Sequence, residues 1–255
     1  MDLGLATRAY LITGGTDGLG LALARRLGEE GASVAICGRD AARLEEAQRA
    51  LDDADVLARR VDVTEPGGLE AFVAASVERF GRLDGVVSNA GRASAMPVAD
   101  STDPDWRDDY ELKVLAAVRL ARAATPHLLD GGSIINVLSV TAKAPDAATT
   151  PTSVSRAAGL ALTKALSREL GPSGVRVNAI LVGLVESGQW ERRAATTGTS
   201  VASLYAAITE HAKIPLGRFG RAEEFADLCA FLLSPRASYI SGAGINLDGG
   251  LSPVS

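Results

Sequence analysis

The fold of this chain is decided by the stretch Thr13-Gly14-Gly15-Thr16-Asp17-Gly18-Leu19-Gly20. An apolar run at residues 9–13 precedes it, and Leu19, Leu23 and Leu27 have the four-residue spacing of a helix that buries one face. Glycines at such a turn let backbone N–H groups approach a diphosphate, which also meets the positive end of the helix dipole. The order of apolar run, glycine-rich turn and helix therefore predicts a nucleotide-binding βα unit.

The alternation of short apolar runs with helical spacing continues to the end of the chain. The runs contain few polar residues, which is typical of parallel strands covered by helices on both faces. Successive strand–helix–strand units with right-handed crossovers build one sheet. We therefore predict a single domain over residues 1–255, a doubly wound (Rossmann-type) α/β fold with a seven-stranded parallel sheet and helices on both faces. The predicted strands are residues 9–13, 33–37, 56–61, 85–88, 133–138, 175–182 and 244–247.

The composition narrows the class of function. With 26 basic and 31 acidic side chains in 255 residues, the formal net charge is −5, and no cluster of Lys and Arg offers the basic surface that nucleic acid requires. No apolar run approaches the roughly 18 residues of a membrane span, and the start has no secretory pattern, so we expect a cytoplasmic protein. Cys37 and Cys229 lie in apolar runs typical of core packing and are too few for a disulfide framework or a multi-cysteine metal site.

One segment departs from the regular alternation. Residues 186–215 are polar, include Gly188 and Gly198, and show no strand pattern. A long insertion near the last strands of a compact domain can serve as a lid over a substrate. The alternative is a solvent-exposed excursion with a short helix at about residues 203–212, and the sequence leaves both interpretations open.

The spacing of Gly14, Gly18 and Gly20 resembles that of the short-chain dehydrogenase/reductase (SDR) family, and further family motifs follow in the family's order. Asp62-Val63 matches the pair that contacts adenine, and Asn89-Ala90-Gly91 matches the motif that lines the cofactor. The resemblance covers almost the whole chain, looks close to ketoacyl reductases and implies an oxidoreductase with a nicotinamide cofactor. Its C-terminal motifs are Asn178-Ala179, Gly183, Pro215-Leu216-Gly217-Arg218, Glu223-Glu224 and Asp248-Gly249-Gly250.

The end of the second predicted strand indicates which nicotinamide cofactor is preferred. An acidic residue there would bind the ribose hydroxyl of NAD, whereas arginine favours the 2′-phosphate of NADP. Position 38 is Gly38 and Arg39 follows it, while Asp40 suits the N-cap of the next helix. Asp17 argues the other way, because NADP-preferring relatives often carry a basic residue at that position. We favour NADP(H) over NAD(H). The resemblance places the cofactor contacts at Gly14, Thr16, Asp17, Gly18, Leu19, Gly20, Arg39, Asp62, Val63, Asn89, Ala90, Gly91, Arg156, Gly183, Val185 and Ser187.

The catalytic positions depart from the family pattern. In the family, Tyr exchanges the proton, Lys lowers the pKa of that Tyr, Ser holds the substrate oxygen and Asn orders a water. Ser139 fits the serine, but thirteen residues later the chain has Thr152, and four residues further it has Arg156. The asparagine position, seven residues after Trp106, is Lys113. The predicted catalytic group is therefore Ser139, Lys113, Thr152 and Arg156, of which only the serine is the family residue.

The chemistry of these residues singles out Lys113. An aliphatic hydroxyl is a far weaker acid than the phenol of tyrosine, so Thr152 cannot replace it as a general acid at neutral pH. Arg156 stays protonated but can bind ribose hydroxyls or an anion. Burial beside Arg156 would lower the pKa of Lys113 and make its amine available for proton transfer or imine formation. The alternative for Lys113 is a surface helix residue paired with a carboxylate.

Three functions are compatible with this pattern. The favoured one is an SDR-type NADP(H)-dependent oxidoreductase that reduces a carbonyl or oxidises an alcohol without the tyrosine. The second is a non-redox lyase, dehydratase or cyclase that uses Lys113 and Arg156 on an anionic substrate. The third is a cofactor-binding pseudoenzyme that serves as a partner subunit or sensor. The fold alone does not choose between them, because function depends on the site, and the sequence does not identify the small-molecule substrate.

Two predicted helices favour self-association. Residues 112–121 are apolar around most of the helix, although a helix that covers one sheet face needs only a stripe. Residues 153–170 include Ala157, Ala158, Ala161 and Ala165, which allow close packing. Family members associate through the corresponding helices, so we expect a homotetramer or, failing that, a homodimer.

Overall fold

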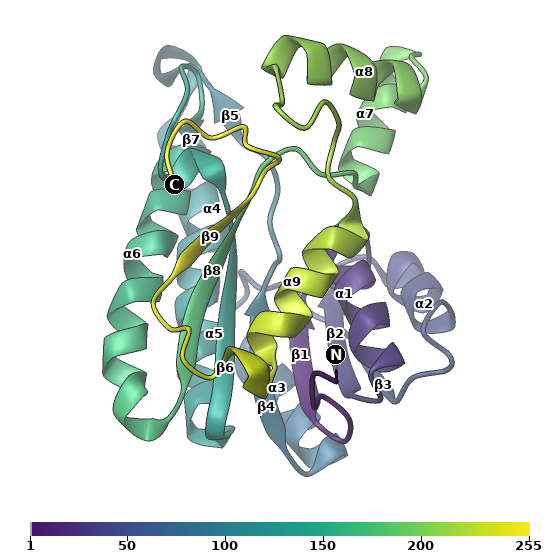
Figure 1. The fold of residues 1–255 in the computed structure, drawn as a ribbon, viewed down its shortest axis with the longest axis vertical. Coiled ribbons are helices and arrows are strands. Elements are labelled where there is room, and N and C mark those ends of the chain that lie inside the picture. The colour runs from purple at the N-terminus through teal and green to yellow at the C-terminus, as the bar shows by residue number, and fades with distance from the viewer. Residues whose placement is uncertain (1) are drawn as a thin grey trace.

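The computed structural model describes residues 2–255, without the side chains of residues 129 and 130, and its centre is one parallel sheet. Seven strands lie in the order β3-β2-β1-β4-β6-β8-β9 (Figure 1), which confirms the predicted fold class. Every neighbouring pair in this sheet is parallel. The strands are β1 (Ala9–Thr13), β2 (Ser33–Gly38), β3 (Val56–Arg60), β4 (Leu83–Ser88), β6 (Leu128–Ser139), β8 (Arg176–Val182) and β9 (Gly244–Leu247).

The order of the strands locates the site. The chain moves outward from β1 through β2 to β3 and then returns to pair β4 on the other side of β1. At this reversal the connections leave in opposite directions and open a crevice at the carboxyl ends of β1 and β4, where doubly wound proteins bind their ligands. The glycine-rich turn and Asn89 both lie at this crevice, because they directly follow β1 and β4.

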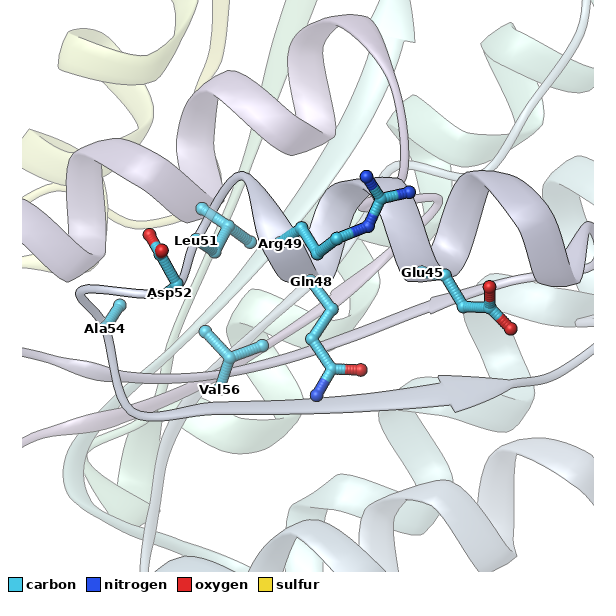
Figure 2. A pocket seen from close by; sticks show the side chains of 7 residues that line it. All are labelled: Glu45, Gln48, Arg49, Leu51, Asp52, Ala54 and Val56. Atoms are coloured by element: carbon cyan, nitrogen blue, oxygen red, sulfur yellow. The ribbon is translucent and has the colours of Figure 1, made fainter.

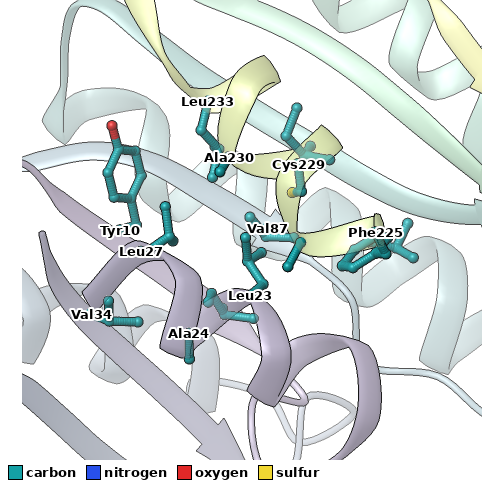
Figure 3. Close-up of a cluster of buried hydrophobic side chains, with 14 of the residues drawn as sticks. Tyr10, Leu23, Ala24, Leu27, Val34, Val87, Phe225, Cys229, Ala230 and Leu233 are labelled. Atoms are coloured by element: carbon teal, nitrogen blue, oxygen red, sulfur yellow. The ribbon is translucent and has the colours of Figure 1, made fainter. Parts of the chain in front are cut away.

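Helices cover both faces of the sheet. On one face, α1 (Gly18–Glu29), α2 (Ala41–Arg49) and α9 (Ala222–Leu233) bury Leu23, Leu44 and Phe225 in one hydrophobic cluster with residues of the sheet. Figure 3 shows the centre of this cluster, with α1 and α9 meeting over the sheet and Cys229 packed between them. The opposite face is covered mainly by α3 (Gly68–Phe80), α5 (Ala116–Ala124) and α6 (Thr152–Leu170). Cys37 is buried in that second cluster.

A two-stranded antiparallel ribbon was not predicted. It pairs β5 (Ala95–Met96) with β7 (Thr150–Pro151). The Thr150 hydroxyl also donates to the Met96 carbonyl oxygen at 2.9 Å. Two-residue strands leave no alternation for a sequence pattern to detect. The ribbon holds the start of α6 beside the segment that follows β4 and leads into α4 (Asp103–Tyr110).

The segment at residues 186–215 contains two helices, of which the sequence predicted only the second. They are α7 (Gly188–Thr197) and α8 (Val201–Ala212), and Figure 1 shows them beyond the carboxyl end of the sheet. Phe219 joins them, because its ring stacks on Tyr205 at 4.5 Å and meets Trp190 edge-on at 5.5 Å. In α7 only Gly188 and Ala194 are buried, so no apolar stripe marks this helix in the sequence. Within residues 2–255, no helix has the length and apolar character to cross a bilayer.

Candidate functional site

The glycine-rich turn is held in place by the segment that follows β4. The Asn89 amide donates to the carbonyl oxygens of Thr13 and Gly14, both at 3.0 Å. In return the Thr13 hydroxyl accepts from the backbone N–H groups of Asn89 and Ala90 at 3.0 and 3.1 Å. A Cβ on Gly20 would lie 2.2 Å from the Gly14 carbonyl oxygen, so only glycine permits this close approach of helix and turn. These contacts keep the N-terminus of α1 open toward the crevice.

A hollow of about 510 Å³ lies beside this turn. Asp62 at its wall accepts hydrogen bonds from the backbone N–H and the hydroxyl of Thr64 at 3.0 and 2.7 Å. Partial burial raises the pKa of Asp62, but the Thr64 hydrogen bonds and the charge of Arg39, 3.6 Å away, outweigh it and lower that pKa. Asp62 is therefore a fixed anion. The predicted contacts that line the hollow are Gly14, Thr16, Arg39, Asp62, Val63, Ala90 and Gly91.

At the end of β2, Gly38 packs closely against Thr16. A Cβ on Gly38 would lie 2.7 Å from the Thr16 methyl carbon, so an aspartate there would require Thr16 to move. The Arg39 side chain is 70% exposed and extends along the wall of the hollow toward Asp62. Asp40 is the N-cap of α2 and accepts from the Arg43 backbone N–H at 3.1 Å, as predicted.

Asp17 contacts the lid-like segment. Its carboxylate forms an ion pair with Arg192 of α7 at 2.7 Å. A Cβ on Gly188 would lie 2.4 Å from the same carboxylate, and one on Gly18 would lie 3.2 Å from the Ser187 Cβ. The first turn of α7 is therefore packed against the glycine-rich turn. Asp17 therefore has a structural partner in this protein.

Lys113 lies in a single π-helical turn, Glu111–Leu115, between α4 and α5. Such turns insert an extra residue into a helix and are frequent at functional sites. The Lys113 side chain is fully buried, and its ammonium donates to the Asp109 carboxylate and to the Thr152 hydroxyl. The alternative interpretation, a surface residue paired with a carboxylate, is therefore wrong about the exposure of Lys113. It is right that a carboxylate, that of Asp109, pairs with it.

The surroundings of Lys113 lower the pKa of its ammonium group. Burial and the positive charge of Arg156 lower the pKa of Lys113 to about 8, although the hydrogen bond and negative charge of Asp109 oppose them. An amine with this pKa can both give and take a proton near neutral pH. The structure thus agrees with the expected lowering of the Lys113 pKa.

The other two predicted catalytic residues lie around this pair. Arg156 is one turn after Thr152 on α6, and its Nη1 donates to the Val137 carbonyl oxygen at 2.7 Å. Burial lowers the pKa of Arg156 to about 10, so it remains a cation at neutral pH. Ser139 ends β6, where its hydroxyl accepts from the backbone N–H and the hydroxyl of Thr141 at 3.3 and 3.1 Å. Within the described residues, no hydrogen bond joins Ser139 to Lys113, Thr152 or Arg156.

The sequence analysis missed two residues of this cluster. Asp109 is buried beside Lys113, and the Ser155 hydroxyl donates to its Oδ2 at 2.5 Å. A signal for Asp109 exists, because it precedes Lys113 by four residues and such pairs share a helix face. Ser155 has no comparable signal, because its contact depends on how α6 packs against α4.

Three predicted cofactor contacts lie beyond the carboxyl end of β8. Gly183 packs closely on the C-terminal segment, since a Cβ there would lie 2.7 Å from the Asp248 Cβ. Val185 pairs with Gly220 as an isolated bridge. Ser187 lies beside Gly18, as described above. These three residues connect the last strands to the glycine-rich turn.

A second hollow, of about 520 Å³, lies far from these residues along the sheet. It is formed between α2 and the first residue of the edge strand β3 (Figure 2). Its position at the amino end of β3 is opposite to the crevice at the carboxyl ends. Its lining is Glu45, Gln48, Arg49, Leu51, Asp52, Ala54 and Val56, and it shares no residue with the predicted site.

Comparisons with known proteins agree with this geometry. A family model described as enoyl-(acyl carrier protein) reductase matches residues 14–252. A candidate ketoacyl reductase of the monensin polyketide synthase from Streptomyces virginiae is 36% identical over 96% of this chain and 97% of its own. The chain belongs to the short-chain dehydrogenase/reductase family. It is an SDR-type oxidoreductase with ketoreductase relatives.

Two solved structures of SDR proteins are similar over nearly the full chain. One is a short-chain oxidoreductase from Pseudomonas aeruginosa with bound NADPH, described as containing an atypical catalytic centre. It is 36% identical with a TM-score of 0.92, and the match covers 98% of this chain and 99% of that one. The other is L-sorbose reductase from Gluconobacter frateurii with NADPH and L-sorbose, 33% identical with a TM-score of 0.94 over 100% of both chains.

The ion pair between Asp17 and Arg192 predicts how α7 is retained. We expect Asp17→Asn to increase amide hydrogen exchange in residues 188–197 about two- to fivefold, because an exposed pair contributes up to about 1 kcal/mol. Asp227→Asn is the matched control, since Asp227 forms an exposed pair with Arg26 at 2.9 Å on another helix pair. Equal exchange in both variants would show that the Asp17 pair does not hold α7.

Proposed function

We propose that this SDR protein is an NADPH-dependent ketone reductase whose proton donor is Lys113. The observation that carries the proposal is the hydrogen bond from the buried Lys113 ammonium to the Thr152 hydroxyl, which stands where the family has its tyrosine. The similar Pseudomonas aeruginosa structure, with its atypical centre and bound NADPH, supports a working site of unusual composition.

The proton follows a short route through the chain's own groups. The Thr152 hydroxyl oxygen accepts from Lys113, so its hydrogen points away from the ammonium and is directed to a substrate oxygen. Thr152 is half-buried and is the member of the pair that a substrate reaches. As negative charge develops on the substrate oxygen, Thr152 passes its proton on and takes one from Lys113. The weak acidity of threonine is no obstacle, because the acid that loses the proton is the amine.

The remaining residues hold the charge and the substrate. The residues that line the hollow beside the glycine-rich turn would hold NADPH, which would supply the hydride for the carbonyl carbon. The Ser139 hydroxyl donates to the carbonyl oxygen and orients it. Arg156 keeps a fixed positive charge beside Lys113, which stabilises the developing oxyanion in a site of low dielectric.

The hollow beside the glycine-rich turn fits the adenosine half of NADPH. The close approaches at Gly14 and Gly20 leave the N-terminus of α1 free for a diphosphate. The acid that NAD preference requires is absent at position 38, where the residue is Gly38. Arg39 and Arg43 both line the hollow and supply positive charge for a 2′-phosphate. These features together favour NADP(H) over NAD(H).

The preference for the phosphorylated cofactor is testable by titration. We expect NADPH to bind more tightly than NADH, and Arg39→Asp to weaken NADPH by roughly tenfold to a hundredfold, the contribution of charge-assisted hydrogen bonds. NADH affinity should stay constant or rise. Isothermal calorimetry measures all four constants. Arg49→Asp, at the remote hollow of Figure 2, controls for the change in net charge. Tighter NADH binding to the unaltered protein would contradict the preference.

The proton route predicts the effect of two nearly isosteric variants. Thr152→Val and the double variant Lys113→Met/Asp109→Asn, which leaves no carboxylate buried without its cation, should each lower kcat for ketone reduction by about 10²–10⁴, the range of general acid catalysis. Thr152→Ser should retain most activity. NADPH consumption with a panel of ketones that includes L-sorbose provides the assay, and calorimetry confirms that each variant still binds NADPH. If only the Lys113→Met/Asp109→Asn variant loses activity, Lys113 donates directly and Thr152 is no relay. If both keep it, the proposed donor is wrong.

Restoring the family residues requires a fourth substitution. Lys113→Asn combined with Thr152→Tyr and Arg156→Lys would leave the Asp109 carboxylate buried without its cation, which costs several kcal/mol. We expect the triple variant to be unstable, and the addition of Asp109→Leu to recover folding and ketone reduction. Thermal unfolding and NADPH consumption measure the two effects. A stable and active triple variant would show that Asp109 tolerates the loss of Lys113.

We also propose that the protein is a homotetramer or a homodimer. Helix α6 exposes Ala157, Ala161 and Ala165 on one face, and Val154 at its start is 50% exposed. Small residues at four-residue intervals let two helices approach closely. Light scattering at micromolar concentration should give a mass of four times or twice 26.3 kDa. Ala161→Glu should reduce that mass, whereas the control Ala207→Glu on α8 should leave it unchanged. A monomeric mass for the unaltered protein would refute the proposal.

A further inference from the structure

Asp109 is the buried carboxylate on which the charge of Lys113 depends. Its two oxygens have different partners: Oδ1 accepts from Lys113, and Oδ2 accepts from the Ser155 hydroxyl at 2.5 Å. The Asp109 side chain is 1% exposed and that of Lys113 is 0% exposed. Asp109 lies in the last turn of α4, and Ser155 lies in the first turn of α6. The carboxylate is therefore fixed from both sides and has no freedom to rotate away from the amine.

The charged groups around Lys113 are mostly positive. Arg156 on α6 and Arg92, after β4, both lower the pKa of Lys113. Asp109 opposes them through its hydrogen bond and its charge. Asp108, next in sequence, is 69% exposed and faces Arg92 at 3.8 Å. Among the described groups that act on Lys113, Asp109 is thus the one that favours the ammonium form.

We propose that Asp109, oriented by Ser155, is a positioning residue that keeps Lys113 protonated and directed at Thr152. The inference rests on the proposed function only for its catalytic consequence. Two N–H groups of the ammonium are committed, one to Asp109 and one to Thr152. These two hydrogen bonds and the bond to Cε fix three of the four directions around the nitrogen. The ammonium therefore stays directed at the Thr152 hydroxyl. The hydrogen bond from the Ser155 hydroxyl fixes the orientation of the Asp109 carboxylate in the same way.

The sign of the effect follows from the charges. An anion in contact with an amine favours its protonated form, so removal of the Asp109 charge leaves burial, Arg156 and Arg92 acting in one direction. The Lys113 amine then loses its proton at lower pH. Ketone reduction requires the ammonium, so its rate falls as the pH rises through the pKa of Lys113. Asp109→Asn should move that fall to lower pH and leave the rate at pH 6 closer to that of the unaltered protein.

The charge of Lys113 can be measured without turnover. The chain has four lysines, at positions 113, 143, 164 and 213, so lysine labelled with ¹³C at Cε gives a simple NMR spectrum. Lys143→Arg, Lys164→Arg and Lys213→Arg each remove one of the other three signals, which leaves the signal of Lys113. We expect the Lys113 pKa to fall by about one unit or more in Asp109→Asn, and by less in Ser155→Ala. Asp108→Asn removes the same charge from an exposed neighbour and should leave the Lys113 titration almost unchanged.

The outcomes separate this inference from the proposed function. An unchanged or raised Lys113 pKa in Asp109→Asn overturns the inference, whatever the activity. A lowered pKa with no matching shift in the pH profile of kcat/KM supports the inference and overturns Lys113 as the proton donor. A purely structural role for Asp109 would lower stability and kcat at all pH values without moving the profile. If Asp109→Asn does not fold, Ser155→Ala carries the test, because it keeps the carboxylate and must lower the pKa in the same direction.

Discussion

A buried ammonium must lie against an anion, and this requirement shapes the part of the protein that holds the predicted catalytic residues. Lys113 has no exposed side-chain surface, and its partner Asp109 is equally inaccessible. Either charge alone would be costly, and removal of one partner from such a pair costs roughly 3–5 kcal/mol. The pair therefore constrains α4, the π-helical turn and α6 to one arrangement, since each contributes a group to it. The positions of Thr152 and Arg156 follow from that arrangement.

The glycine-rich turn depends on a different constraint, the close approach of backbone segments. Asn89 donates to the carbonyl oxygens of Thr13 and Gly14, which joins β1 and β4 at the point where the strand order reverses. Glycines allow that contact, and the first turn of α7 packs against the same turn through Asp17. The two regions meet at Gly91, where a Cβ would lie 3.0 Å from Arg156 Nη2. A substitution at Arg156 therefore changes the packing at Gly91, which lines the hollow beside the glycine-rich turn.

The sequence predicts what depends on periodicity and on short motifs, and it fails where contacts join distant segments. Short runs with few polar residues identified all seven strands of the main sheet, and the glycine spacing located the turn. The two-residue strands β5 and β7 and the polar helix α7 were missed, because neither carries a hydrophobic pattern. At the site, counting from Trp106 and Ser139 found Lys113, Thr152 and Arg156. Asp109 and Ser155 were missed, because their role arises only when α4 and α6 are packed together.

Under the proposed function, the three altered positions act as one replacement rather than as separate losses. In the family pattern the tunable acid is a phenol on the helix that corresponds to α6, and a neighbouring lysine lowers its pKa. Here the tunable acid is the amine of Lys113, and the neighbouring cation that lowers its pKa is Arg156. A second lysine at position 156 would make it uncertain which amine holds the proton, whereas arginine stays charged and leaves Lys113 as the group that titrates. The short side chain of Thr152 leaves space for the Lys113 ammonium to reach its hydroxyl. The exchange of tyrosine for threonine is therefore consistent with the other substitutions, and Asp109 supplies the negative charge that two adjacent cations require.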